Sequence, residues 1–456
     1  MSDTIAAIAT GGGVSAIGIV RVSGPDAISA ADKVFRSAGG TAMAHADPRR
    51  MYYGRFQGAD GAVIDLCVCT VSRGPYSYTG EDTAEFHCHG SPVVLSEVLR
   101  ALFTHGVRQA GAGEFTKRAF LNGKMDLTQA EAVIDLIEAE TLPAAQNAAG
   151  QLHGAVRARI DAIYSALIDV MAHFHAVIDY PDEDIDDFEM NGYLRAINSA
   201  GAELSRMLDT HLSGKNLRGG IPAAIIGRPN TGKSSLLNAL LGYDRAIVTA
   251  LPGTTRDTIE EKLVLGGVPL RMIDTAGLRE TGDTVEKLGI ERTLGALEEA
   301  GLSILVLDGS EPLRDEDYQA YRTVPSGVPC VAVVNKSDLP TVVNDAELRE
   351  MGLNFCRVSA ATGQGLGALE SEIAKLFPAL SSPPGGELIT NARQYDAISR
   401  ARDSTARAAS AIEDRVTPDA VLTEVESALA AMGEVTGGVM REDVTDRIFE
   451  RFCVGK

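Results

Sequence analysis

The sequence has 456 residues, 45% of them hydrophobic and 23% charged, which is typical of a globular protein with more than one domain. Its 62 acidic and 42 basic residues give a net charge of −20, which argues against an electrostatic grip on nucleic acid by the chain as a whole. Because the amino terminus lacks a basic signal segment and no apolar run approaches the roughly 18 residues of a membrane span, we expect a cytoplasmic protein.

Residues 1–118 predict a mixed α+β domain. Apolar, β-rich runs at Ala16–Val22, Met51–Phe56 and Val63–Val71 are separated by Gly, Pro and Asp. Cys67 and Cys69 lie two residues apart in the third run, so they share one face of the expected strand and are predicted to be core residues rather than metal ligands. Reduced thiols fit a cytosolic location.

Residues 126–179 are rich in Ala, Leu, Gln and Glu at helical spacing, which predicts two or three helices. After an acidic run, helical character resumes through Leu212, and Ser213–Gly220 is interpreted as a short linker. Residues 221–380 alternate β-rich runs with helices, as in a doubly wound, mostly parallel sheet. A Ser/Pro/Gly segment follows, and residues 391–432 are again helical.

This order predicts a multidomain α/β protein in which one all-α domain, built from both sides of the sequence, carries an inserted α/β domain. The expected divisions are an N-terminal domain at 1–118, helical segments at 119–214 and 383–456, and the inserted domain at 215–382.

The inserted domain begins with a phosphate-binding motif. Residues 227–234 match GxxxxGK[ST], between the apolar strand Ile221–Ile226 and a helical run. Loop N–H groups and the helix N-terminus would face the phosphates, Lys233 would neutralise their charge, and Ser234 would ligate magnesium.

Further GTPase motifs follow in the expected order. Asp274–Gly277 follows a predicted strand, which places a carboxylate near magnesium and a glycine N–H near the γ-phosphate. Asp338, in the sequence Asn-Lys-Ser-Asp, can accept two hydrogen bonds from guanine that adenine cannot offer, so it selects GTP. Ser359-Ala360 would support the base, and Thr255 is the expected second magnesium ligand from a switch loop.

The residue that orients the attacking water is not evident from these motifs. The position after the DxxG glycine, where Ras-type GTPases carry a glutamine, is Leu278. The following segment offers Glu280, Asp283, Glu286 and Glu291, and their spacing alone does not choose among them. No arginine in the switch segment is an evident arginine finger, so the negative charge that develops on the phosphates needs another neutralising group. Asn230 in the phosphate loop is a candidate ligand of a monovalent cation that could supply it.

The whole chain resembles the MnmE (TrmE) family of tRNA uridine-modifying GTPases. The resemblance rests on five stretches: Ile17–Gly24, Tyr78–Asp82, Gly113–Asn122 with Lys124, Asp274–Ile290, and the terminal Phe452–Lys456.

The resemblance implies a homodimer whose N-terminal domain binds a tetrahydrofolate derivative, either 5,10-methylene or 5-formyl, as one-carbon donor. The folate contacts correspond to Arg21, Glu81, Lys124 and Lys456. Cys453 is a candidate for chemistry at the folate–uridine site.

The resemblance also assigns the water-orienting role to Glu286 and a potassium site to Asn230, Thr249, Leu251 and Thr254. Hydrolysis would then be potassium-stimulated and coupled to dimerisation of the G domains. The residues expected to bind GTP are Asn230, Thr231, Gly232, Lys233, Ser234, Ser235, Thr249, Gly253, Thr254, Thr255, Asp274, Thr275, Ala276, Gly277, Asn335, Lys336, Asp338, Ser359 and Ala360.

The implied reaction adds a carboxymethylaminomethyl or aminomethyl group to carbon 5 of the tRNA wobble uridine, together with an FAD-containing MnmG partner in a heterotetramer or larger complex. A ribosome-assembly GTPase of the Era or EngA type is the alternative, because it shares the phosphate-loop and Gly-Thr-Thr-Arg-Asp features. Such proteins usually append a basic RNA-binding domain, which this sequence lacks. A non-enzymatic GTP-binding switch is a third interpretation.

Overall fold

The computed structural model describes residues 3–11, 13–179, 187–247, 261–273, 299–381, 385–438, 448–450, 452, 454 and 455. The chain forms two compact units: unit 1 contains Met1–Ile134 and Ala430–Lys456, and unit 2 contains Asp135–Leu429. None of the helices in the described ranges combines the length and apolar character needed to cross a lipid bilayer. The four segments expected from the sequence stay a prediction.

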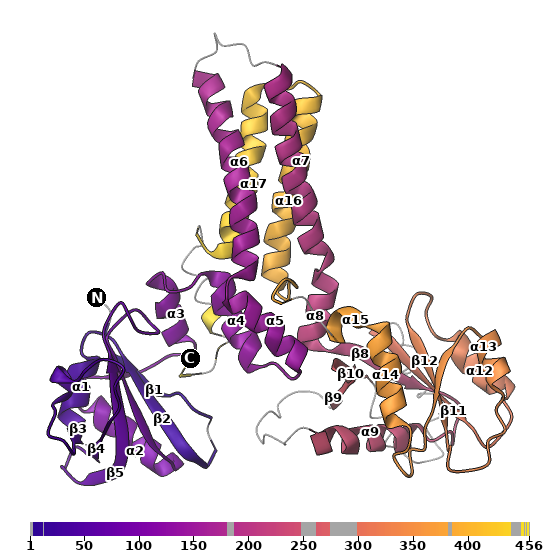
Figure 1. Ribbon diagram of the computed structural model, residues 1–456, viewed down its shortest axis with the longest axis horizontal. Helices are drawn as coiled ribbons and strands as arrows, with labels where there is room; N and C mark the ends of the chain where they lie inside the picture. The colour runs from indigo at the N-terminus through magenta and orange to yellow at the C-terminus, as the bar shows by residue number, and fades with distance from the viewer. Residues whose placement is uncertain are drawn as a thin grey trace. The chain divides into compact units, whose positions relative to one another are not determined.

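Unit 1 is built around a sheet of seven described strands in the order β3-β4-β5-β6-β2-β1-β7 (Figure 1). Neighbouring strands are antiparallel except for β1 and β7, which are parallel. Its elements are β1 (Ile5–Ile8), β2 (Ser15–Ser23), α1 (Ala27–Val34), β3 (Phe35–Ser37), the 3₁₀ helix η1 (Met43–His45), β4 (Tyr52–Gln57), β5 (Val63–Ser72), β6 (Thr83–Gly90), α2 (Pro92–Phe103), β7 (Arg108–Gln109), α3 (Glu114–Leu121) and α4 (Leu127–Ile137).

Alternating side chains give this sheet a core on one face. Helices α1 and α2 pack there against residues that include Cys67, Cys69 and Phe86. The predicted strands and the core positions of the two cysteines are therefore confirmed. A smaller cluster joins Phe115 of α3 to Ile5 and its neighbours from β1.

The last residues of the sequence belong to the same unit as the first. Phe449 and Phe452 pack with Leu127 of α4 in one apolar cluster. Val454 forms an antiparallel bridge with Ala112. Through these contacts the terminal segment packs in the same unit as the sheet that contains β1.

Unit 2 contains a helical bundle and a second sheet. Its elements are α5 (Leu142–Leu152), α6 (Ala155–Asp179), α7 (Asp187–Asp209), α8 (His211–Gly219), β8 (Ile221–Ile226), α9 (Lys233–Ile247), β9 (Glu261–Leu265), β10 (Val268–Met272), β11 (Leu302–Asp308), α12 (Asp315–Arg322), β12 (Cys330–Asn335), α13 (Asp345–Glu350), β13 (Asn354–Arg357), α14 (Leu366–Leu376), α15 (Pro378–Ser381), α16 (Ala392–Glu413) and α17 (Pro418–Thr436), whose last turns lie in unit 1.

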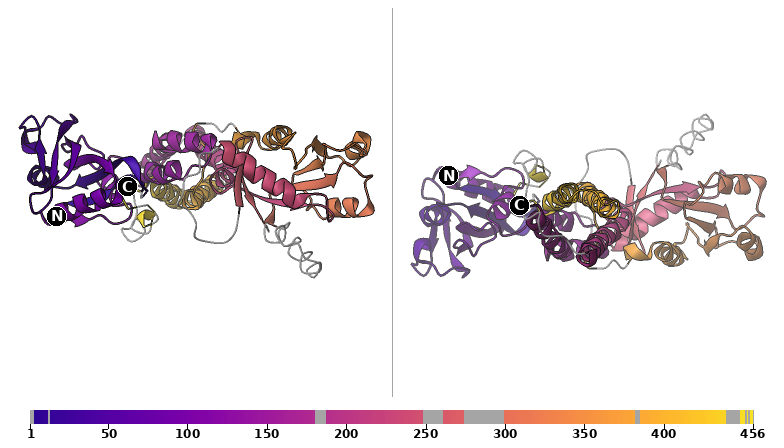
Figure 2. Two further views of the ribbon diagram at one scale, coloured as in Figure 1. Left: turned by 90° about the horizontal axis from the view of Figure 1, so that it is seen from below. Right: turned by 90° about the horizontal axis from the view of Figure 1, so that it is seen from above.

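Helices α6, α7, α16 and α17 run side by side in Figure 1, and Figure 2 shows the same bundle end on. Helices α7 and α16 pack closely, an ion pair joins Arg407 of α16 to Glu424 of α17, and the His175 ring of α6 lies 3.5 Å from the Glu426 carboxylate of α17. Segments before and after the second sheet in the sequence therefore form one bundle.

The interpretation of Ser213–Gly220 as a linker is wrong, because nearly all of this segment lies in helix α8. Gly214 lies against the backbone of Ile389, where a Cβ atom would be 2.3 Å from the carbonyl oxygen. Leu217 is buried in the core of the second sheet. The glycine therefore permits close packing of a helix, and its sequence signal was mistaken for flexibility.

The second sheet has the order β13-β12-β11-β8-β10-β9 among the described strands. All neighbours are parallel except the hairpin β9–β10. Leucines of α9 and α14 pack on one face with Ile225 and Val306, whereas Leu348 of α13 packs on the other face with Ile226 and Leu307. Both faces are therefore covered by helices, as predicted for residues 221–380.

Candidate functional site

The first candidate site lies at the carboxyl end of β8, where a loop leads into α9. Gly227 has φ +144°, and a Cβ atom on it would lie 2.4 Å from the carbonyl oxygen of Val306. Asn230 adopts φ +63° at the tip of the loop. Strand, tight loop and helix N-terminus occur in the order that the phosphate-binding motif requires, so the backbone N–H groups of this loop are arranged to receive an anion.

Lys233 lies within the curve of this loop. Its Nζ donates hydrogen bonds to the carbonyl oxygens of Gly227 at 2.8 Å and Arg228 at 2.9 Å. Burial lowers the pKa of the Lys233 amino group, and the nearby Arg228 cation adds to this effect. A partly desolvated ammonium group beside a loop of backbone N–H groups suits the phosphates of a nucleotide. Ser234 and Ser235 follow in the first turn of α9.

Asn335 joins the phosphate loop to the loops expected at the base. Its Nδ2 donates to the carbonyl oxygen of Thr231 at 2.9 Å, and its Oδ1 accepts from the backbone N–H of Ala360 at 3.0 Å. Gly232 lies so close that a Cβ atom there would be 2.2 Å from Asn335 Nδ2. One buried amide therefore fixes three motifs that are far apart in the sequence.

Asp338 is exposed, and its Oδ1 accepts a hydrogen bond of 2.6 Å from the buried hydroxyl of Ser359. The hydroxyl orients a carboxylate that retains further lone pairs for two donors of a guanine base. The Ser359 side chain thus positions Asp338, a contact that the sequence motif did not indicate.

The sequence interpretation missed two supporting acidic groups. Asp308 lies at the carboxyl end of β11. It accepts a hydrogen bond of 2.5 Å from Nζ of Lys336, whose backbone has φ +61°. Burial opposes ionisation of Asp308, but hydrogen bonds from Lys336 and Ser310 hold its pKa below the usual range. An aspartate that ends an apolar strand next to the phosphate-loop strand is the signal that could have revealed it.

The second missed group is Asp317 of α12, which pairs with Arg228 of the phosphate loop. Arg228 also pairs with Glu311. The Arg228 side chain is only 9% exposed, so these ion pairs anchor the phosphate loop to the segment after β11.

Several predicted site residues lie outside the described residues, and their roles stay predictions. They are Thr249, Leu251, Gly253, Thr254, Thr255, Asp274, Thr275, Ala276, Gly277, Glu286, Cys453 and Lys456.

The second candidate site surrounds residues 74–82, the loop between β5 and β6 in unit 1. Arg21 of β2 places its guanidinium 5.2 Å from the centre of the Tyr78 ring and pairs with Glu85 at 2.7 Å. Lys124 donates to the carbonyl oxygen of Pro75 at 2.9 Å. Glu81 belongs to this loop, so the structure brings three of the four residues expected to bind folate to one loop.

Comparisons with known proteins cover both parts of the chain. The protein-family model described as GTP-binding protein TrmE N-terminus matches residues 4–124, and the family model of the MnmE helical domain matches residues 127–453. A tRNA modification GTPase MnmE from Symbiobacterium thermophilum is 44% identical over 461 residues, which is 100% of this chain and 99% of that protein. Its counterpart from Thermus thermophilus is 43% identical over 465 residues, 100% of both chains.

Among solved structures, the G domain of the T. maritima FeoB iron transporter is 23% identical with a TM-score of 0.25. The match covers 34% of this chain and 96% of that one.

Proposed function

Because the chain belongs to the MnmE family of tRNA modification GTPases, we propose that it adds a carboxymethylaminomethyl or aminomethyl group to carbon 5 of the tRNA wobble uridine. The protein is a GTP hydrolase that acts in tRNA modification. Identity above 40% over the whole chain is the observation that carries the proposal.

We propose that the loop at residues 74–82 takes part in binding a reduced folate. The cations of Arg21 and Lys124 suit the carboxylates of the folate tail, and the carboxylate of Glu81 suits its N–H donors. The exposed, aromatic Tyr78 beside Arg21 offers a surface on which a flat ring can stack. When bound, the folate supplies the one-carbon unit. Lys456 and Cys453 complete the proposed site.

We propose that Ser234 and Thr255 hold magnesium, and that Asn230, Thr249, Leu251 and Thr254 hold potassium, which supplies positive charge at the phosphates. In this proposal Glu286 orients the attacking water. Hydrolysis is completed when two G domains meet, within a homodimer that acts with an FAD-containing MnmG-type partner in a heterotetramer or larger complex. The four segments 1–118, 119–214, 215–382 and 383–456 are its proposed domains, and its proposed location is the cytoplasm.

Replacing Glu286 by alanine is expected to lower kcat for GTP hydrolysis roughly 10²- to 10⁴-fold, because the attacking water loses the carboxylate that orients it. GTP affinity should stay unchanged. Single-turnover rates of GTP hydrolysis, measured in potassium and in sodium, test the role of Glu286 and the role of the ion. Glu280→Ala in the same segment is the matched control. Equal rates in the two salts would contradict the potassium site, and lost GTP binding would make Glu286 structural.

The proposed function is tested by nucleoside analysis of tRNA from cells that lack the protein. We expect wobble uridines without the aminomethyl-type group, and their recovery when the unaltered gene is restored. Unchanged wobble uridines with defective ribosome assembly would favour the Era or EngA type of function instead.

A further inference from the structure

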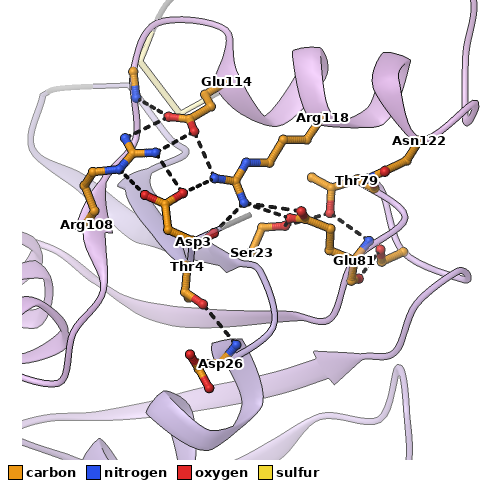
Figure 3. A network of polar contacts seen from close by, with 12 residues as sticks. Asp3, Thr4, Ser23, Asp26, Thr79, Glu81, Arg108, Glu114, Arg118 and Asn122 are labelled. Carbon is orange, nitrogen blue, oxygen red and sulfur yellow. Dashed lines mark hydrogen bonds and ion pairs between the residues drawn. The ribbon is translucent and has the colours of Figure 1, made fainter. Parts of the chain in front are cut away.

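Two arginines and three carboxylates form one hydrogen-bonded cluster in unit 1 (Figure 3). Arg118 of α3 lies at its centre and contacts all three acids. It donates to Asp3 Oδ1 at 2.8 Å, to Glu114 Oε1 at 3.0 Å and to Glu81 Oε2 at 3.1 Å. Arg108 pairs with Asp3 and Glu114 on the side away from Glu81. Arg118 therefore links the loop that carries Glu81 to two other parts of the chain.

The carboxylate of Glu81 is held from two directions. Ser23 of β2 donates its hydroxyl to Glu81 Oε2 at 2.7 Å, and one guanidinium nitrogen of Arg118 approaches both carboxylate oxygens. The side chains of Arg118 and Glu81 are 10% and 13% exposed. A pair this shielded from water keeps a defined geometry, and each carboxylate oxygen can accept more than one hydrogen bond.

Helix α3 also fixes the backbone of this loop. Asn122 lies four residues after Arg118, on the same side of the helix, and donates to the carbonyl oxygen of Thr79 at 2.7 Å. Gly80 has φ +79°, and a Cβ atom there would lie 3.3 Å from Cγ of Lys124. The helix and the residues after it therefore set the position of Glu81 relative to Lys124.

Charge favours an ionised cluster. Hydrogen bonds from Arg108 lower the pKa of Asp3 far below its usual range despite partial burial, and Arg118 contributes in the same direction. Burial acts to lower the pKa of Arg118, but hydrogen bonds to Glu114 and Glu81 raise it above its usual value. Three carboxylates and two guanidinium groups leave one formal negative charge, so the part of a ligand that meets this cluster is favoured to donate hydrogen bonds and not to be anionic.

We propose that Arg118 is a positioning residue for folate recognition: it fixes the Glu81 carboxylate in the orientation that accepts hydrogen bonds from the N–H donors of a reduced folate. This inference rests on the proposed folate function of the same loop. Both Nη atoms of the Arg118 guanidinium are engaged by protein groups, so Arg118 acts through Glu81 and not as a ligand contact.

The test is a double-mutant cycle on the full chain, with 5-formyltetrahydrofolate as the probe and its Kd measured by calorimetry. Arg118→Met and Glu81→Gln are each expected to weaken binding roughly 10- to 100-fold, the effect of losing a charged hydrogen bond. In the Glu81→Gln background, Arg118→Met should weaken binding no further, because contacts that act through one group are not additive. A further loss of equal size in that background would overturn the inference.

Stability gives a second readout. Arg118→Met leaves the shielded carboxylate of Glu81 without its counter-ion and should lower the unfolding temperature, and adding Glu81→Gln should recover part of that loss. If Arg118→Met does not fold, Arg118→Lys replaces it in the cycle, because lysine keeps the charge but lacks the planar fork whose two Nη atoms face Glu81 on one side and Asp3 and Glu114 on the other. GTP hydrolysis, measured in every variant, reports whether the rest of the chain is folded.

Arg108→Met is the matched control, since Arg108 shares Asp3 and Glu114 with Arg118 but does not contact Glu81. It should leave folate affinity unchanged. A loss as large as that of Arg118→Met would mean that the cluster acts only through stability, and would overturn the inference. Absence of folate binding to the unaltered protein would instead overturn the folate function itself, and the inference with it.

Discussion

Replacing Asp338 by asparagine is expected to lower GTP affinity roughly 10²- to 10³-fold, because a carboxylate that accepts two guanine N–H groups contributes about 3–4 kcal/mol through charged hydrogen bonds. Asparagine keeps one acceptor but turns a donor toward the exocyclic amine. The same variant should bind xanthosine triphosphate better than the unaltered protein, because xanthine presents an oxygen at that position. Titration with fluorescent guanosine and xanthosine triphosphates measures both effects.

The control for this experiment is Ser359→Ala. It removes the 2.6 Å hydrogen bond to Asp338 Oδ1 and leaves the carboxylate in place. We expect a loss of GTP affinity of roughly tenfold, with guanine still preferred over xanthine. Unchanged GTP affinity in Asp338→Asn would contradict the assignment of this residue to base recognition.

Replacing Gly232 by alanine is the second change with a large expected effect. The residue has φ +95°, and its Cβ atom would lie 2.2 Å from Asn335 Nδ2, so the amide must move away from Thr231 and Ala360. Backbone strain of about 1–2 kcal/mol and two lost hydrogen bonds should lower the free energy of unfolding by about 3–5 kcal/mol. GTP affinity should fall with it, because Asn335 joins the phosphate loop to the base loops.

Gly266→Ala provides the comparison for this prediction. Gly266 lies in the β9–β10 hairpin with φ +60°, and its Cβ atom would lie 2.5 Å from the carbonyl oxygen of Glu370. Chemical denaturation should show a similar loss of stability, whereas GTP affinity of the folded protein should not change. If Gly232→Ala binds GTP as tightly as Gly266→Ala does, the Asn335 bridge does not support nucleotide binding.

The nucleotide motifs were predictable because strand, loop and helix signals are local. The strand before the phosphate loop was expected at Ile221–Ile226, and β8 has these bounds. In contrast, the contact between Arg118 and Asp3 spans 115 positions, and helical periodicity identifies the side of a helix but not the partner that covers it. The pairing of Asp317 in α12 with Arg228 is distant in the sequence in the same way, whereas Asp308 at the end of β11 carried a local signal. Gly214 in α8 contributed to the wrong prediction of a linker, because glycine is typical both of flexible segments and of closely packed helices.

Unit 1 is built from two segments that are far apart in the sequence, so it cannot fold completely until the second segment has been synthesised. Its sheet is made from the earliest residues, but Phe449, Phe452 and Val454 reach it only after residues 135–429 have been synthesised. At about 5–20 residues per second this interval is roughly 15–60 s. During that time Leu127 and Ala112 lack their final neighbours. A ribosome that stops late in the message would therefore leave a chain with a complete GTPase segment and an incomplete unit 1.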